Sequence, residues 1–441
     1  MVTRLLLVPL THTWDGQTWA NVFAELTSAG SLLDAFRRPY EVTRELSLLT
    51  QAAGHASDFY ESWAYPPLML YVYWPLAHLY TALHGGLQVI FPVQPAYFAS
   101  SLPVSLLTLI HLPDLLADIG TLALMRKLGV SPRELAWYAF NPLVLLAGVW
   151  TFDSVMVFFL VAALLLAERR HWGWCGVLLG LGAATKYVPL VVLPALVAAA
   201  LWQSGRHGAK RRLLAVFASL AATLAVLVAP VAGGVRYVVQ AQMSRFASGL
   251  TVQQAWGTWA EQLPFTDWQP RWQLYASGLL GSWLLPLALL AATWLLLRRP
   301  LPLRAGFLIM VLAFLAGSKL VNEHYALAPM ALLTIQLAHQ PSAGLRGCRT
   351  LLWVTAFCYA AINTPLWGFA FSLVQQLAPP SATAISHWAD AYRLFLSYPE
   401  SAWPYLALGC AFTGVVTATI WLVAAGGREE SGAVIATQLV W

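Results

Sequence analysis

Charged residues are scarce in this sequence. Only 10% of its 441 residues are Asp, Glu, Lys or Arg, whereas 59% are hydrophobic. A water-soluble protein of this length cannot cover its surface with so few charges. Apolar runs of about 17–25 residues recur along most of the chain, each long enough to cross a bilayer. The composition excludes a soluble globular protein and predicts a polytopic α-helical membrane protein.

Cysteine is also rare, and its positions exclude two kinds of site. The chain has four cysteines, all in or beside apolar runs, and none has the spacing of a metal site or a disulfide framework. We interpret them as small core residues. The apolar run Leu5–Leu10 is too short for the core of a cleavable signal peptide. We expect that no metal and no cofactor is required.

Basic residues exceed acidic ones by 25 to 19, yet nothing indicates a nucleic-acid partner. They fall in short clusters, and short loops rich in Arg and Lys mark the cytoplasmic side of a membrane. The clusters are Arg126-Lys127 with Arg133, Arg169-Arg170, Arg206 with Lys210–Arg212, Arg298-Arg299 with Arg304, and Arg346 with Arg349. Asp153, Lys186 and Lys319 then lie on the opposite face, together with three long loops.

The predicted fold is all-α: one polytopic integral membrane bundle over 1–441, with about 11–13 membrane helices, some of them short. The extracytoplasmic loops are 11–65, with one or two interface helices, 235–276 and 375–402. A stretch around 87–100 is re-entrant or a tight return. The predicted spans are 66–84, 102–125, 135–150, 153–168, 172–186, 188–203, 211–234, 277–297, 303–318, 321–338, 350–374 and 403–425.

Two of the four lysines follow apolar runs, where a cation is costly and is usually kept for a reason. Lys319 opens a polar stretch between two hydrophobic helices, with Asn322, Glu323, His324 and Tyr325. Such a set suits a phosphate group. The alternative is a helix junction that satisfies its own polar groups, with Lys319 paired to Glu323.

Lys186, followed by Tyr187, is the second such lysine. It is a candidate for a further phosphate contact, or else a side chain that reaches to the membrane interface.

Asp15 precedes the amphipathic stretch Thr18–Leu33 in the first predicted external loop. A carboxylate there could act as a general base on an acceptor hydroxyl. The alternative is that Asp15 caps the helix, with Trp14 and Trp19 as interface aromatics.

Three polar residues, His111, Asp114 and Asp118, follow i, i+3, i+7 spacing and share one helical face, which we expect to point into the bundle. This face could bind a cation, position a polar substrate or pair with the lysines; the alternative is an internal structural cluster. Asp153 stands between two spans with almost no loop. It either caps the second helix alone or also contacts the substrate.

Taken together, these positions resemble the GT-C superfamily of membrane glycosyltransferases, and are similar to the GPI mannosyltransferase catalytic subunit and to related bacterial mannosyltransferases. The likeness covers about residues 12–330. The matching elements, in order, are Asp15, Trp63–Leu68 with Tyr65, Leu112–Asp118, Phe140–Pro142, Phe152–Ser154, Leu181–Pro189 and Ser318–Tyr325.

The resemblance implies an inverting transfer from a polyprenyl-phosphate-linked sugar, often mannose, to a lipid, glycan or protein acceptor. The enzyme would be a multi-pass protein of a bacterial plasma membrane, among membrane lipids, with an extracytoplasmic active site. The implied base is Asp15. The implied substrate contacts are Tyr65, Asp114, Asp118, Asp153, Lys186, Tyr187, Lys319, Asn322, Glu323, His324 and Tyr325.

Two other functions remain as alternatives. A secondary transporter or lipid flippase predicts inverted repeats and broken helices at mid-membrane. The sequence shows no such repeat, and its polar residues gather on one face, which favours an enzyme. The other alternative is a non-catalytic membrane assembly protein.

Overall fold

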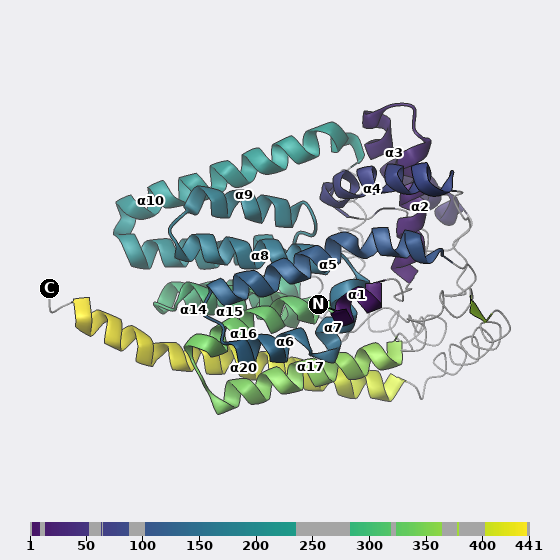
Figure 1. The fold of residues 1–441 in the computed structure, drawn as a ribbon. Coiled ribbons are helices and arrows are strands. Elements are labelled where there is room, and N and C mark those ends of the chain that lie inside the picture. The colour runs from purple at the N-terminus through teal and green to yellow at the C-terminus, as the bar shows by residue number, and fades with distance from the viewer. Residues whose placement is uncertain are drawn as a thin grey trace.

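The fold is a bundle of helices packed side by side (Figure 1). The computed structural model describes residues 2–8, 14–52, 63, 65–87, 102–234, 283–318, 323–363, 377–378 and 402–438, and these contain helices and no strand. The first helices are α1 (Val2–Leu7), α2 (Trp14–Ser28), α3 (Leu32–Ala52), α4 (Leu68–His84), α5 (Val104–Lys127), α6 (Pro132–Ala139), α7 (Pro142–Trp150), α8 (Asp153–Glu168) and α9 (Trp172–Ala183).

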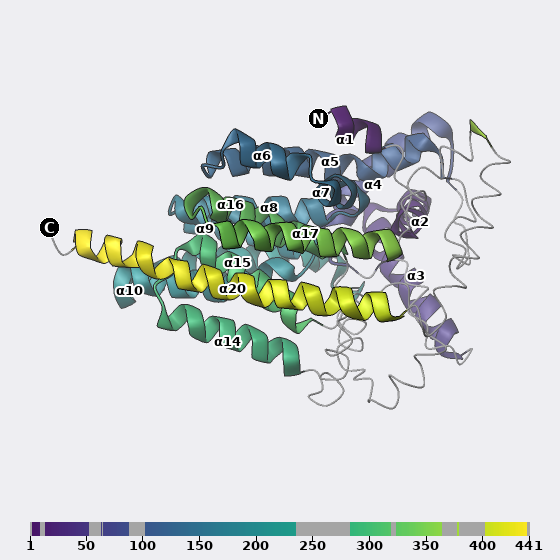
Figure 2. The same ribbon diagram turned by 90° about the horizontal axis from the view of Figure 1, so that it is seen from below.

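The second half of the chain continues the bundle. It contains η3 (Val188–Val192), α10 (Leu193–Val228), η4 (Ala229–Val231), α14 (Leu284–Arg298), α15 (Leu303–Gly317), η6 (Glu323–Ala326), α16 (Leu327–His339), α17 (Ala343–Asn363) and α20 (Ala402–Gln438). Figure 2 shows α20 running along α17 and α15 for most of the bundle's length. The predicted all-α class is confirmed.

Several helices can cross a membrane. Three in the described residues are long and apolar enough: Val104–Lys127, His207–Gly234 and Ala407–Gly426. A fourth span forms if the bent pair Pro142–Gly148 and Asp153–Glu168 counts as one, and four shorter apolar helices accompany them. The protein is therefore a polytopic membrane protein. The number of 11–13 membrane helices stays a prediction.

The predicted span 135–150 is wrong, because two helices, α6 and α7, occupy it. The local sequence explains the break. The Asn141 side chain caps α7 by accepting hydrogen bonds from the backbone N–H of Leu143 at 3.0 Å and of Val144 at 3.4 Å. Pro142, at the first position of α7, has no N–H with which to continue α6.

Smaller differences concern helix ends. Most of the two spans predicted over 188–203 and 211–234 lies in the single helix α10, which is preceded by η3 and followed by η4. By hydropathy the same region divides into two apolar stretches, Val188–Gln203 and His207–Gly234. The helix predicted over 172–186 ends at Ala183, and α17 begins before the predicted residue 350. Hydropathy locates apolar runs but not the residue at which a helix begins or ends.

Close packing joins α9 to α10. A Cβ atom on Gly176 would lie 2.2 Å from the carbonyl oxygen of Val216, and one on Gly180 would lie 2.8 Å from Cβ of Thr223. Glycines four residues apart on one face let two helices approach closely in a membrane protein. The Ser219 hydroxyl uses this proximity and donates to the Gly173 carbonyl oxygen at 2.7 Å. This packing fixes the end of α9, just before Lys186.

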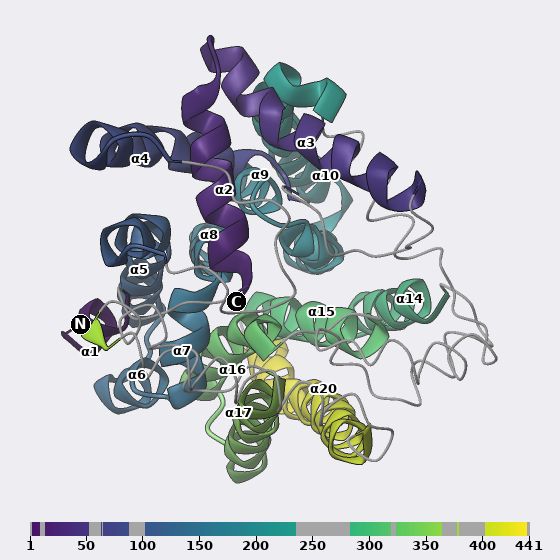
Figure 3. The same ribbon diagram turned by 90° about the vertical axis from the view of Figure 1, so that its right-hand side faces the viewer.

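The helix ends and connections that carry the basic clusters in the sequence lie at one end of the bundle (Figure 1). The segment after α5 meets the end of α16, where the His339 ring lies 2.8 Å from the Leu128 carbonyl oxygen. Arg304 and Glu168 come within 3.9 Å at the same end. At the opposite end, α2 and α3 lie across the helix axes (Figure 3). This arrangement agrees with the sidedness predicted from Arg and Lys, although which end faces the cytoplasm stays a prediction.

Some expectations fall on residues outside the described ranges. These are the stretch 88–100, the whole loop 235–276, most of the loop 375–402, Lys319 and Asn322, and the side chains of Asp15 and Glu323.

Candidate active site

Asp153 lies at a sharp bend between two helices. The axes of Pro142–Gly148 and Asp153–Glu168 differ by 108°. The bend is held by the Ser154 hydroxyl, which donates to the Gly148 carbonyl oxygen at 2.7 Å. Asp153 is the first residue of α8, and the cap residue is Phe152. The bend brings a fully buried carboxylate to the end of the bundle that α2 and α3 cover.

Lys186 lies just beyond the end of α9. Its backbone N–H donates to the Gly182 carbonyl oxygen at 2.9 Å, which closes the last turn of the helix. Pro189 then occupies the first turn of the short helix η3. The same helix end is tied to α4, because the Leu68 N–H donates to the Ala184 carbonyl oxygen at 2.8 Å.

Lys186 and Asp153 form a buried ion pair. Nζ of Lys186 lies 2.7 Å from Oδ2 of Asp153, and the two side chains are 6% and 0% exposed. The Thr151 hydroxyl also donates to this oxygen. A buried pair of this kind is stable only when its geometry is good and further hydrogen bonds satisfy it. The charge of Lys186 is thus partnered within the protein.

Three aromatic rings surround the same ammonium group. Lys186 Nζ lies 5.3 Å from the ring centre of Tyr65, 5.4 Å from that of Phe152 and 4.9 Å from that of Tyr325. Rings at this distance attract a cation through their quadrupoles. Tyr65 is held by α3, where the Tyr40 hydroxyl donates to its carbonyl oxygen at 3.0 Å.

These rings come from the two hydrophobic clusters of the bundle. Phe152 and Tyr65 belong with the cluster of α2, α3, α4 and the start of α5. Tyr325 packs against the larger cluster formed by the other helices. The charged pair therefore lies at the seam between two apolar cores.

His324 completes the group. Its Nε2 lies 3.7 Å from Oδ2 of Asp153, and its side chain is 8% exposed. Three buried polar atoms nearby have no hydrogen-bond partner among the described residues: Oδ1 of Asp153, Nδ1 of His324 and Oδ1 of Asp114. Such atoms are rare in folded proteins and are expected beside a ligand, water or another polar group.

His111 and Asp114 lie close to this group. The His111 Nδ1 is 3.4 Å from Oδ2 of Asp114, and both side chains are fully buried. Asp114 interacts electrostatically with Asp153 and Lys186. The Trp19 ring of α2 is 6.0 Å from the His111 ring. The predicted inward direction of this helical face is confirmed.

Asp118, one turn further along α5, belongs to a different contact. It forms a buried ion pair with Arg4 of α1, whose guanidinium also donates to the Ala139 carbonyl oxygen at 2.6 Å. Sequence reasoning missed Arg4 as its partner. The available signal was a single cation in the apolar segment before Asp15. Within the described residues, Asp118 is thus partnered by an arginine and not by a lysine.

Tyr187 packs against the larger apolar core. Its ring is 6.4 Å from that of Phe314 in α15, within the larger hydrophobic cluster. The structure thus brings together six of the predicted residues, and their arrangement puts charged and aromatic groups in one place. The six are Tyr65, Asp114, Asp153, Lys186, His324 and Tyr325.

The described residues contain no group of three His, Cys, Asp or Glu side chains that could hold a metal ion. The buried group around Asp153 and Lys186 offers carboxylates, imidazoles, one ammonium group and aromatic faces. Carboxylates and imidazoles can accept or donate a proton, and cations can stabilise a leaving phosphate.

A helical membrane bundle with such a buried acid–base group fits a membrane enzyme that acts on a polar substrate. Comparison with known families makes this specific: the model of glycosyltransferase family 87 matches residues 63–318, more than half of the chain. The protein belongs to glycosyltransferase family 87 and is a membrane glycosyltransferase. Comparison with curated proteins found no match.

The family match supports one resemblance predicted from the sequence and leaves another unconfirmed. It supports the GT-C type of membrane glycosyltransferase, whereas the specific likeness to the GPI mannosyltransferase is not confirmed. The matched region includes Tyr65, Asp114, Asp153 and Lys186. It ends at Ser318, so Asp15 and the stretch from Lys319 lie outside it.

Proposed function

We propose that this protein transfers a sugar, mannose, from a polyprenyl-phosphate donor to an acceptor hydroxyl of a lipid, glycan or protein. The reaction takes place on the extracytoplasmic side with inversion at the anomeric carbon. Asp15 is the general base. The donor is bound by the residues around Lys186, with Asp118 and Tyr187, and by the stretch Lys319–Tyr325.

The proposed step is a single displacement. The acceptor oxygen forms a bond to the anomeric carbon as the bond from that carbon to the phosphate oxygen breaks. The phosphate keeps the electron pair and leaves as polyprenyl phosphate, and Asp15 takes the acceptor proton. A lipid phosphate leaves readily once a cation stabilises its charge, so little acid assistance is needed.

The observation that carries this proposal is the buried group of Asp153, Lys186 and His324, with its unsatisfied polar atoms at the covered end of the bundle. Because Lys186 is paired with Asp153, we assign the phosphate to Lys319 and His324. Lys186 then orients Asp153 and the aromatic rings that face the sugar.

The helix α2 supports the role of Asp15. Asp15 is the second residue of α2. It stands four residues before Trp19, and positions i and i+4 share one helical face. The Trp19 ring packs against those of Phe152 and His111, at 5.3 and 6.0 Å. This face of α2 is therefore the one that meets the buried group.

The test measures sugar transfer from radiolabelled polyprenyl-phosphate mannose by the purified full-length protein in membranes. Asp15→Asn should lower transfer at least 100-fold, as expected for loss of a general base, with donor binding retained. The matched control is Asp34→Asn, an exposed acid of α3 whose contact is with Ser31 at 2.6 Å.

The control variant should transfer sugar at the wild-type rate. Full activity of Asp15→Asn would remove Asp15 as the base. Transfer from a glucose donor and not from the mannose donor would correct the sugar and keep the reaction class. Failure of the wild-type protein with both donors would overturn the lipid-phosphate donor.

A further inference from the structure

A charged cavity lies at the other end of the bundle, away from the candidate active site. It has a volume of about 570 Å³. Its walls come from the first turns of α6 and α17, two helices far apart in the sequence. Its lining residues are Arg133, Glu134, Trp137, Arg346 and Arg349. The size is within the range of cavities that bind small ligands.

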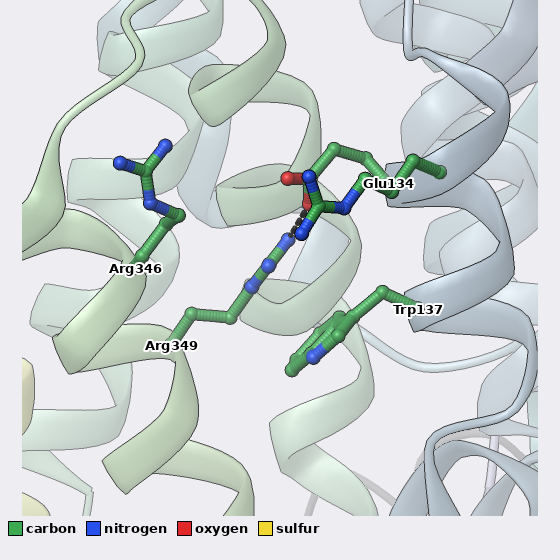
Figure 4. A pocket seen from close by; sticks show the side chains of 5 residues that line it. Glu134, Trp137, Arg346 and Arg349 are labelled. Atoms are coloured by element: carbon green, nitrogen blue, oxygen red, sulfur yellow. Dashed lines mark hydrogen bonds and ion pairs between the residues drawn. The ribbon is translucent and has the colours of Figure 1, made fainter.

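One arginine of this cavity is held in place. Arg349 forms an ion pair with Glu134, and its guanidinium lies 3.6 Å from the ring centre of Trp137 (Figure 4). Its side chain is only 5% exposed. Its Nε has no hydrogen-bond partner among the described residues, although it is buried. A buried donor without a partner is unusual and is expected beside a water molecule or a ligand.

The other two arginines leave the cavity strongly positive. Arg133 and Arg346 are exposed. Figure 4 shows Arg346 standing apart from the contact between Arg349 and Glu134. Three arginines against one glutamate give a formal charge of +2. Arginine remains charged at any physiological pH and binds phosphate oxygens in a forked geometry. The cavity is therefore suited to an anion with several oxygen acceptors.

The same two helices also carry exposed apolar side chains. Phe140, after α6, is 62% exposed, and Leu351 of α17 is 53% exposed. In a membrane bundle, exposed side chains of this kind meet lipid chains. A ligand with both a phosphate and acyl chains would satisfy both parts of this surface.

We propose that this cavity binds the phosphate headgroup of an anionic membrane lipid. Basic pockets between helices at the cytoplasmic side of membrane proteins bind such headgroups, and anionic lipids are enriched in that leaflet. The cavity is lined by the starts of α6 and α17, which are at the predicted cytoplasmic end. The site is separate from the proposed sugar transfer and does not depend on it.

The experiment measures lipid binding to the purified full-length protein by native mass spectrometry. The probes are phosphatidylglycerol, phosphatidylcholine and inorganic phosphate. Phosphatidylglycerol should bind in preference to phosphatidylcholine. In the double variant Arg133→Ala/Arg346→Ala its affinity should fall about 10–30-fold, since each cation contributes about three- to fivefold. The ion pair between Arg349 and Glu134 is left intact, so the fold should survive.

The matched control is the double variant Arg126→Ala/Lys127→Ala. These two exposed cations lie at the end of α5 and do not line the cavity. The control loses the same charge and should keep the wild-type affinity. An equal loss in both variants would show general attraction to the surface and overturn the site. Equal binding of the two lipids, or binding of inorganic phosphate alone, would overturn the assignment to an anionic lipid.

Discussion

The two ends of the bundle each contain an ion pair with an aromatic partner, yet the pairs differ in surroundings. At the covered end, Lys186 and Asp153 are 6% and 0% exposed, between two apolar cores. At the basic end, Arg349 is equally buried but its partner Glu134 is 23% exposed at the mouth of a cavity. The first pair is enclosed by protein, and the second faces outward.

This difference indicates what each pair is for. An enclosed pair is costly to desolvate and contributes little net stability, so its value lies in the chemistry or the specificity that it provides. A pair at a cavity mouth loses less hydration and can hold one arginine ready for a ligand. A third contact, between Arg304 and Glu168, is more exposed still, at 18% and 27%. Burial therefore predicts an order of effects when each acid is neutralised.

The largest effect is expected at the enclosed pair. Asp153→Asn leaves the ammonium group of Lys186 buried without a counter-charge, which should cost about 3–5 kcal/mol of stability. The double variant Asp153→Asn/Lys186→Met removes both charges and should recover most of the lost stability. Sugar transfer should be abolished in the single and in the double variant. The measurement is the thermal unfolding midpoint in detergent, together with the yield of monodisperse protein.

A double variant no more stable than Asp153→Asn would contradict this account. The unpaired lysine would then not be the source of the loss, and the bend between α7 and α8 would become the explanation. Measurement of Lys186→Met alone completes the cycle and gives the coupling between the two side chains.

An intermediate effect is expected at the cavity. Glu134→Gln removes the carboxylate from Arg349 but leaves the stacking on Trp137 and access to water through the cavity. Loss of one charge-assisted hydrogen bond should lower stability by about 1.5–3 kcal/mol. Arg346→Ala, one turn away and exposed, is the control and should change stability by less than about 0.5 kcal/mol. A loss as large as that of Asp153→Asn would show that the cavity does not hydrate the arginine.

The sequence predicted the general fold and one face of the site. Hydropathy located the apolar helices but not all of their ends. The spacing of His111, Asp114 and Asp118 predicted an inward face, and this face is buried. The pairing of Lys186 with Asp153, 33 residues apart, was not foreseen. Such a contact depends on how α8 packs against α9, and no local pattern of residues specifies it.

Local signals explain part of what was missed. Asn141 followed by Pro142 is typical of a helix start. This signal lies inside the predicted span 135–150 and marks where α7 begins. The contact of Arg4 with Asp118 spans 114 residues and could only be found in three dimensions. Asp15 and Lys319 remain predictions, because the side chain of the first and the whole of the second lie outside the described residues.

The smallest effect is expected where the pair is most exposed. The closest atoms of Arg304 and Glu168 are 3.9 Å apart, and both side chains meet solvent or lipid headgroups. An ion pair of this kind contributes less than about 1 kcal/mol, and salt screens it. Glu168→Gln should therefore shift the unfolding midpoint least of the three acid variants. The shift should be smaller still in 1 M salt, where the Debye length is about 3 Å. A shift as large as that of Glu134→Gln and insensitive to salt would mean that burial does not set the order. The difference between the two ends of the bundle would then have to come from the helices that carry the pairs.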